Sequence, residues 1–127
     1  MMTPAARSLH IFGLYLIGAG CLLMLVPALL LAPLGLPAPA DAWGHVAGML
    51  AAFLGIYYLL GARAELLSFM RASVWVRLSV IVILGAFVAA GLAPLPLLAF
   101  GVIDLAAAAW TWLALRSMGA AVALRAA

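Results

Sequence analysis

The sequence predicts an all-α membrane protein with four transmembrane helices in two hairpins, formed by one integral membrane domain over residues 1–127. Three observations predict this class. Of the 127 residues, 71% are hydrophobic and only 7% are charged, whereas a soluble domain is about half apolar and about a quarter charged. The mean hydropathy is +1.38, which also excludes a disordered chain. Prolines and charged residues divide the apolar sequence into four segments, each long enough to cross a bilayer.

The first span is predicted over residues 9–31, after a helix start at Thr3-Pro4. At about 1.5 Å per residue this run covers a hydrocarbon core of about 30 Å. Pro27 should bend the helix or end it early, because proline lacks the amide proton and clashes with the preceding turn. A short non-helical loop is predicted next, on account of four residues: Pro33, Gly35, Pro37 and Pro39.

The second span is predicted over residues 42–61, with Asp41 as its N-terminal cap. Residues 62–72 hold three charges and no proline, so they should extend this helix out of the bilayer before a reversal near Ser73. The third span is predicted over residues 74–92, where Pro94 and Pro96 end it. The fourth is predicted over residues 95–115.

The basic residues predict the orientation of the chain in the membrane. All six are arginines, and they precede the first span, lie between the second and third or at that boundary, and follow the fourth: Arg7, Arg63, Arg71, Arg77, Arg116 and Arg125. The positive-inside rule therefore predicts cytoplasmic termini and a cytoplasmic central loop in a multi-pass protein of the cell inner membrane. Because these arginines adjoin apolar runs and form no basic face, we expect no nucleic-acid partner.

Two other interpretations of the N-terminal half are a cleavable signal peptide and a haem or metal site. Arg7, the apolar stretch and the tripeptide Ala38-Pro39-Ala40 imitate a cleavable signal peptide. The stretch is much longer than the roughly 7 to 15 residues of the apolar core of a signal peptide, so we expect no cleavage. His10 and His45 fall at opposite ends of their spans and cannot ligate one haem or metal together. We expect no cofactor and no metal.

A stripe of small residues follows one face of the second span: Gly44, Gly48, Ala51, Gly55 and Ala62. Small residues let membrane helices pack closely, so this face should contact another helix. Tyr58 shares the stripe and should point into the bundle. The stripe can be used within one chain or between chains, which leaves a homo-oligomer open.

Asp104 is the only acid within the fourth span. Small or weakly polar residues flank it at helical spacing, so it should face protein: Gly101, Ala107, Ala108 and Thr111. It should lie about 14 Å below the outer boundary, near the middle of the bilayer. A carboxylate there costs about 3 kcal/mol, so it should be protonated, paired or hydrated. Arg77 is the one basic candidate partner, directly, through water or through Tyr58.

Two interpretations of Asp104 follow. In the functional one it is a proton carrier, a cation site or a general acid/base, and Tyr58 and Arg77 adjust its proton affinity. In the structural one it fixes helix register through a hydrogen bond to Thr111 or to a backbone carbonyl.

Three clusters of residues suggest a family. They are Tyr57-Tyr58 with Gly61-Ala62-Arg63 and Glu65, Ser73 with Val76-Arg77, and Phe100-Gly101 leading through Asp104 to Trp110-Thr111. In four spans of this length, the combination resembles the BphX-like family of small bacterial membrane proteins. The resemblance covers essentially the whole chain and implies a link to the handling of aromatic compounds, without implying any catalytic residue.

Three functions are compatible with these features. The first is an accessory or binding module, embedded in the lipid bilayer, for an apolar or aromatic small molecule. The second is a small proton-coupled multidrug exporter, although such exporters carry their acid in the first span, which has none here. The third is a membrane enzyme, an isomerase or hydratase, with Asp104 as acid/base and Tyr58 as donor. The enzyme predicts a cavity between the second and fourth spans that reaches Asp104.

Overall fold

The computed structural model describes all 127 residues, and every regular element in it is helical. Its four long helices are α1 (Pro4–Leu25), α3 (Ala42–Arg63), α4 (Leu67–Ala89) and α5 (Leu98–Ala126). The connections contain the short helix α2 (Pro27–Leu31) and two 3-10 turns, η1 (Ala32–Leu34) and η2 (Leu95–Leu97). Four helical segments are long and apolar enough to cross a membrane, which confirms the predicted all-α, four-span class.

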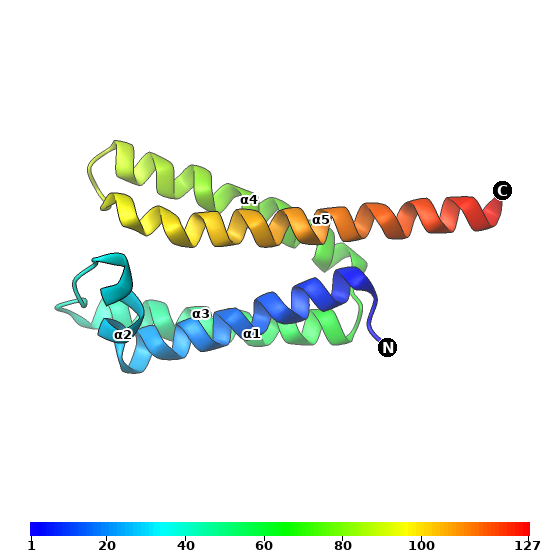
Figure 1. The fold of residues 1–127 in the computed structure, drawn as a ribbon. Coiled ribbons are helices and arrows are strands. Elements are labelled where there is room, and N and C mark those ends of the chain that lie inside the picture. Colours follow the sequence, from blue (N-terminus) through cyan, green and yellow to red (C-terminus); the bar gives the residue numbers. More distant parts are fainter.

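The long helices form two antiparallel hairpins (Figure 1), as predicted. Helix α1 packs along α3, helix α4 packs along α5, and the contact between the hairpins is made mainly by α1 and α5. The hairpins lie close together at the end that holds the N-terminus and diverge toward the end that holds α2 and the α4–α5 connection (Figure 1). The interface between the hairpins therefore has a closed end and an open end.

Glycines bring the backbones of α1 and α3 together. A Cβ atom added to Gly20 would lie 2.5 Å from the backbone nitrogen of Ala52, and one added to Gly55 would lie 2.7 Å from the carbonyl oxygen of Gly13. Gly48, Gly55 and Tyr58 are buried, which confirms that this face of α3 packs against protein. Gly44 instead packs against Pro39 of the preceding loop.

The first predicted span is interrupted at Pro27, as the proline suggested, so the helix ends at Leu25 rather than at residue 31. The loop prediction for residues 32–39 was partly wrong, because Ala32–Leu34 form a 3-10 turn. The ring of His45 stabilises the break. Its Nδ1 donates a hydrogen bond of 2.6 Å to the carbonyl oxygen of Met24, close to the end of α1.

The predicted reversal near Ser73 was wrong, because α3 ends at Arg63 and α4 already begins at Leu67. Glu65 takes the left-handed conformation with φ of 48°, and the N–H of Leu66 donates to the carbonyl oxygen of Gly61 at 3.1 Å, a closure typical of helix C-termini. Usually glycine fills this position, so the sequence carried no turn signal. The third span thus starts at residue 67 rather than 74, and α5 continues to Ala126 rather than ending at 115.

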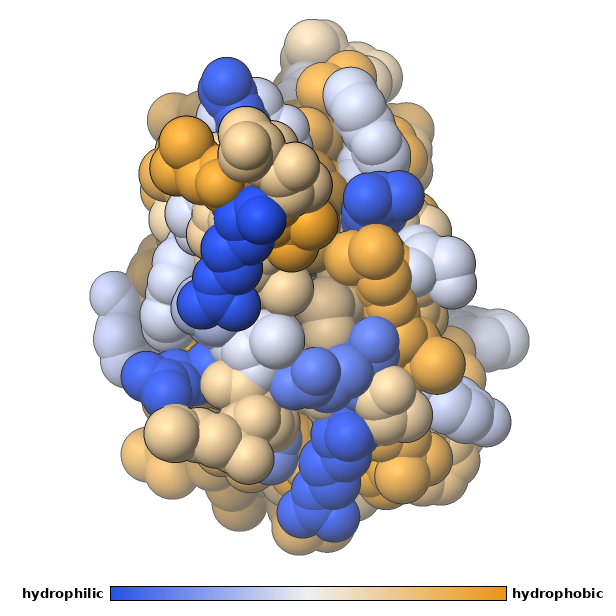
Figure 2. Space-filling view, turned by 90° about the vertical axis from the view of Figure 1, so that its right-hand side faces the viewer, coloured by the Kyte–Doolittle hydropathy of each residue, from blue (hydrophilic) through white to orange (hydrophobic).

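Charged residues gather at the closed end of the molecule. The start of α1 and the α3–α4 turn lie at this end, and the last turns of α5 project beyond them (Figure 1). The exposed side chains of this end give the polar patches seen end-on in Figure 2. The exposed arginines of this end are Arg7, Arg63, Arg71, Arg116 and Arg125. In contrast, large apolar side chains are exposed along all four long helices, as expected for surfaces that face lipid.

Candidate functional site

Arg77 lies in the closed end of the hairpin interface and is only 1% exposed. Its Nε donates to the carbonyl oxygen of Ser73 at 3.2 Å, one turn earlier on α4. Its Nη2 donates to the hydroxyl of Thr111 on α5 at 2.8 Å and to the hydroxyl of Ser73 at 3.3 Å. The guanidinium therefore connects the two helices of the second hairpin.

Aromatic rings and a further hydroxyl from the first hairpin complete the surroundings of this guanidinium. Its carbon lies 4.7 Å from the ring centre of Phe12 and 5.7 Å from that of Tyr58, distances at which a cation is attracted by the ring face. The hydroxyls of Ser8 and Thr111 are 2.9 Å apart and hydrogen-bonded. The group Ser8, Phe12, Tyr58, Ser73, Arg77 and Thr111, here called the Arg77 cluster, thus joins α1, α3, α4 and α5.

The Arg77 cluster is best understood as a structural connection between the hairpins. A buried cation is tolerated only where hydrogen bonds and π faces replace water, and here both are supplied by fixed helices. One nitrogen, Nη1 of Arg77, is buried without a hydrogen-bond partner. The cluster therefore holds its charge in a buried site with most, but not all, of its donors satisfied.

Asp104 lies on α5 outside this cluster. It is partly buried, and its carboxylate makes no hydrogen bond and no ion pair with the rest of the chain. The predicted direct pair with Arg77 is therefore absent. The structural interpretation expected a hydrogen bond from Asp104 to Thr111. The Thr111 hydroxyl instead bonds to Ser8, Arg77 and the carbonyl oxygen of Ala107.

A cavity of about 370 Å³ lies between the hairpins at their open end and reaches Asp104. We call it the Asp104 crevice. Its wall comes mainly from α1, with contributions from α2, α3, η2 and α5, and is largely apolar apart from Asp104 and Tyr15. The apolar lining includes Leu16, Ala19, Leu23, Leu30, Leu97 and Phe100. An unpaired carboxylate thus borders an apolar space of the size of a small-molecule site.

Tyr58, the predicted donor beside Asp104, does not line the crevice. It packs in the Arg77 cluster, where its ring centre lies 5.2 Å from the ring centre of Phe12 and 5.4 Å from that of Phe69. Tyr15 lines the crevice instead. The sequence did hold a signal for it, since Ser8, Phe12 and Tyr15 stand at i, i+4 and i+7 on one face of α1.

Apart from Asp104, few interior side chains could bind a metal ion or another ligand. No three His, Cys, Asp or Glu side chains gather closely enough to hold a metal ion. His10 is partly buried, and its Nδ1 has no hydrogen-bond partner, while Cys21 is a free thiol on α1. Neither residue lines the crevice.

Comparisons with protein families, with curated proteins and with solved structures find no match for this chain. The two interior charges, Arg77 and Asp104, are therefore the features of the fold that bear on function. Together they define a small all-α membrane protein in which Arg77 is enclosed and Asp104 borders an accessible space.

Proposed function

We propose that the protein is a membrane-embedded binding module for a small apolar or aromatic molecule that carries a cationic or hydrogen-bond-donating end. The observation that supports this most directly is the Asp104 crevice, in which the carboxylate has no protein partner. The apolar wall would receive the hydrophobic body of the ligand, and Asp104 would receive its polar end. Tyr15 would add a hydroxyl beside that end.

The size and polarity of the crevice narrow the ligand class. A cavity of about 370 Å³ is near the lower end of the range for small-molecule sites, which favours a ligand with one or two rings. Within a poorly hydrated site, a hydrogen bond to a charged group contributes about 2 kcal/mol. The preferred ligand is therefore an aromatic amine rather than an aromatic acid.

The membrane setting belongs to the same proposal. We infer an inner-membrane location with both termini and the α3–α4 turn in the cytoplasm, because the exposed arginines share one end of the molecule. The crevice would then open toward the outer half of the bilayer. Membership of the BphX-like family is proposed on the residue clusters alone, and location of the gene within an aromatic-degradation cluster would support it.

The binding proposal can be tested with 1-naphthylmethylamine and its uncharged analogue 1-ethylnaphthalene on the purified protein in neutral detergent. The wild-type protein should bind both, with the amine preferred. Asp104→Asn should reduce affinity for the amine about tenfold and leave the uncharged analogue unchanged, because only the amine uses the carboxylate.

A pair of larger substitutions provides the control for the position of the site. Ala19→Trp fills the crevice and should abolish binding of both compounds. Ala106→Trp, on an exposed position of α5 outside the crevice, should change neither. Equal binding of the amine by wild type and Asp104→Asn would remove the role assigned to Asp104, and binding that survives Ala19→Trp would exclude the crevice.

A proton-coupled exporter is the second candidate, favoured by the unpaired acid inside a span. It predicts that, in proteoliposomes, an imposed pH gradient drives the wild-type protein to move the naphthyl amine against its own concentration gradient in exchange for protons, and that Asp104→Asn stops this movement. Binding without movement supports the module over the exporter. Chemical conversion of the bound compound, lost in Asp104→Asn, would favour the membrane enzyme.

A further inference from the structure

A groove on the outer face of the second hairpin stands apart from the crevice. Two adjoining cavities, of about 320 and 310 Å³, lie between α4 and α5 and share Val74, Trp75 and Trp112. The first is wholly apolar and continues along Leu78, Ala108 and Ala109. The second ends between Arg71 and Arg116. We call the two together the tryptophan groove.

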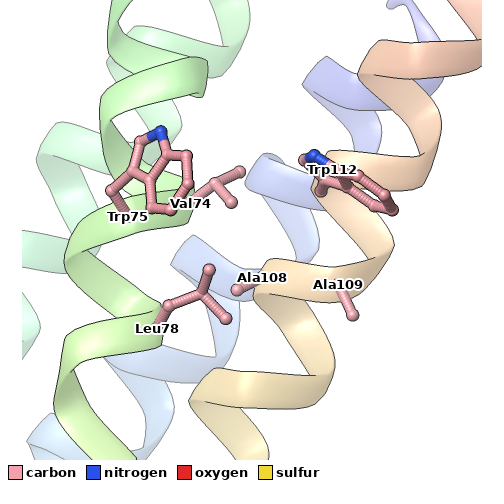
Figure 3. Close-up of a pocket in the computed structure, with 6 residues that line it drawn as sticks. All are labelled: Val74, Trp75, Leu78, Ala108, Ala109 and Trp112. Atoms are coloured by element: carbon pink, nitrogen blue, oxygen red, sulfur yellow. The ribbon is translucent and has the colours of Figure 1, made fainter. Parts of the chain in front are cut away.

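The side chains of the groove are arranged in order of polarity. Figure 3 shows Trp75 on α4 and Trp112 on α5 on opposite sides of the groove, with Val74, Leu78 and Ala108 between the two helices. Both indole nitrogens lie on the same side of their rings, toward the end from which Arg71 and Arg116 come (Figure 3). The groove thus passes from two cations, through two amphipathic rings, to an apolar floor.

We propose that the tryptophan groove binds one anionic phospholipid, with the lipid phosphate between Arg71 and Arg116 and an acyl chain along the apolar floor. Arginine recognises phosphate oxygens through its fork of donors, and tryptophan prefers the level where head groups meet acyl chains. Arg116 already stacks over Trp112, with 4.7 Å between the guanidinium carbon and the ring centre, which orders its side chain beside the groove. The two arginines attract a lipid with a net negative charge more strongly than a lipid with no net charge.

The same charges disfavour a second copy of this chain as the occupant. Copies in one membrane share their orientation, so a two-fold dimer through this face would bring four arginines to one level. A lipid phosphate meets the same arginines with opposite charge. The proposal is independent of the ligand of the Asp104 crevice, which lies between the hairpins rather than on the outside of one.

The test titrates the purified full-length protein in neutral detergent with phosphatidylglycerol, and separately with phosphatidylcholine of the same chains and with inorganic phosphate, using native mass spectrometry. Each arginine near the head group strengthens binding about fivefold, so one phosphatidylglycerol should bind about 25-fold more tightly than phosphatidylcholine. The double variant Arg71→Gln/Arg116→Gln should abolish this preference. The matched variant Arg63→Gln/Arg125→Gln, which removes two exposed arginines of the same end, should keep it.

A second variant separates the acyl groove from surface charge. Ala109→Phe places a bulky ring at the rim of the apolar part of the groove and should weaken both lipids, whereas Ala106→Phe on the same helix should weaken neither. Equal affinity for the two lipids, equal loss in both arginine doubles, or unaltered binding in Ala109→Phe would each overturn the proposal. Displacement of phosphatidylglycerol by equimolar inorganic phosphate would also overturn it, because the site would then recognise phosphate without the chain.

Discussion

The two ends of the hairpin interface treat a buried charge in opposite ways. At the closed end, Arg77 is enclosed by four helices, and hydroxyls and aromatic rings occupy most of its surface. At the open end, Asp104 is left without a protein partner beside an apolar space. Both charges lie in helices that are apolar enough to span a membrane, so the difference between them comes from the splaying of the hairpins.

This contrast separates structural charge from available charge. A guanidinium with most of its donors used on fixed partners contributes to holding the helices together. A carboxylate with free lone pairs must obtain them from water, a proton or a ligand. Intramembrane charge alone is thus a weaker functional signal than intramembrane charge that borders a cavity.

The largest expected effect comes from Arg77→Ala. It removes the hydrogen bonds to Ser73 and Thr111, the contact with Phe12, and most of a fully buried side chain, so we expect about 3 kcal/mol of lost stability. Thermal unfolding in detergent measures it, with the exposed Arg125→Ala as control. If Arg77→Ala unfolds no more readily than the control, the closed end is not held by this cluster. The variant Arg77→Met keeps much of the side-chain volume but removes the charge, so it separates the contribution of packing from that of the guanidinium.

Gly20→Leu should have the next largest effect, about 2 kcal/mol, because a Cβ there would meet the α3 backbone at 2.5 Å. It breaks the α1–α3 contact that supports one wall of the open end. Gly18→Leu is the matched control two residues away, where nothing lies within 4 Å of an added Cβ. Similar melting temperatures for these two variants would contradict the close packing of the first hairpin.

Thr111→Val should cost about 1 kcal/mol, since the shape is kept while the hydroxyl that bonds to Arg77 and Ser8 is lost. The same unfolding assay serves, with Ser117→Ala on α5 as the control for a hydroxyl that bonds only its own helix. A cost as small as that of the control would mean that the Arg77 cluster depends on its aromatic rings and not on this hydroxyl.

Asp104→Asn should have the smallest effect on stability, under about 0.5 kcal/mol, because the carboxylate makes no hydrogen bond in the protein. Its effect should appear in ligand binding instead. A loss of stability comparable to that of Arg77→Ala would revive the interpretation of Asp104 as a residue that fixes helix register.

Tyr58, Tyr15 and Glu65 show which features of the fold and of the site could be predicted from the sequence. The small-residue stripe correctly predicted that Tyr58 points inward, because one helix sets its own face by period alone. It did not predict that Tyr58 meets Arg77 while Tyr15 accompanies Asp104, because that depends on which faces of different helices oppose each other. The turn at Glu65 was missed for a local reason, since its left-handed conformation occurs without glycine.

The sequence by itself determined an all-α chain with four apolar helices and a break at Pro27. Composition and period suffice for these features, because a backbone in lipid must satisfy its own hydrogen bonds and helices do so within each segment. The tertiary structure decided which charge is enclosed and which borders a crevice. Those outcomes depend on the angle between two hairpins, which is set by side-chain packing between helices far apart in the sequence.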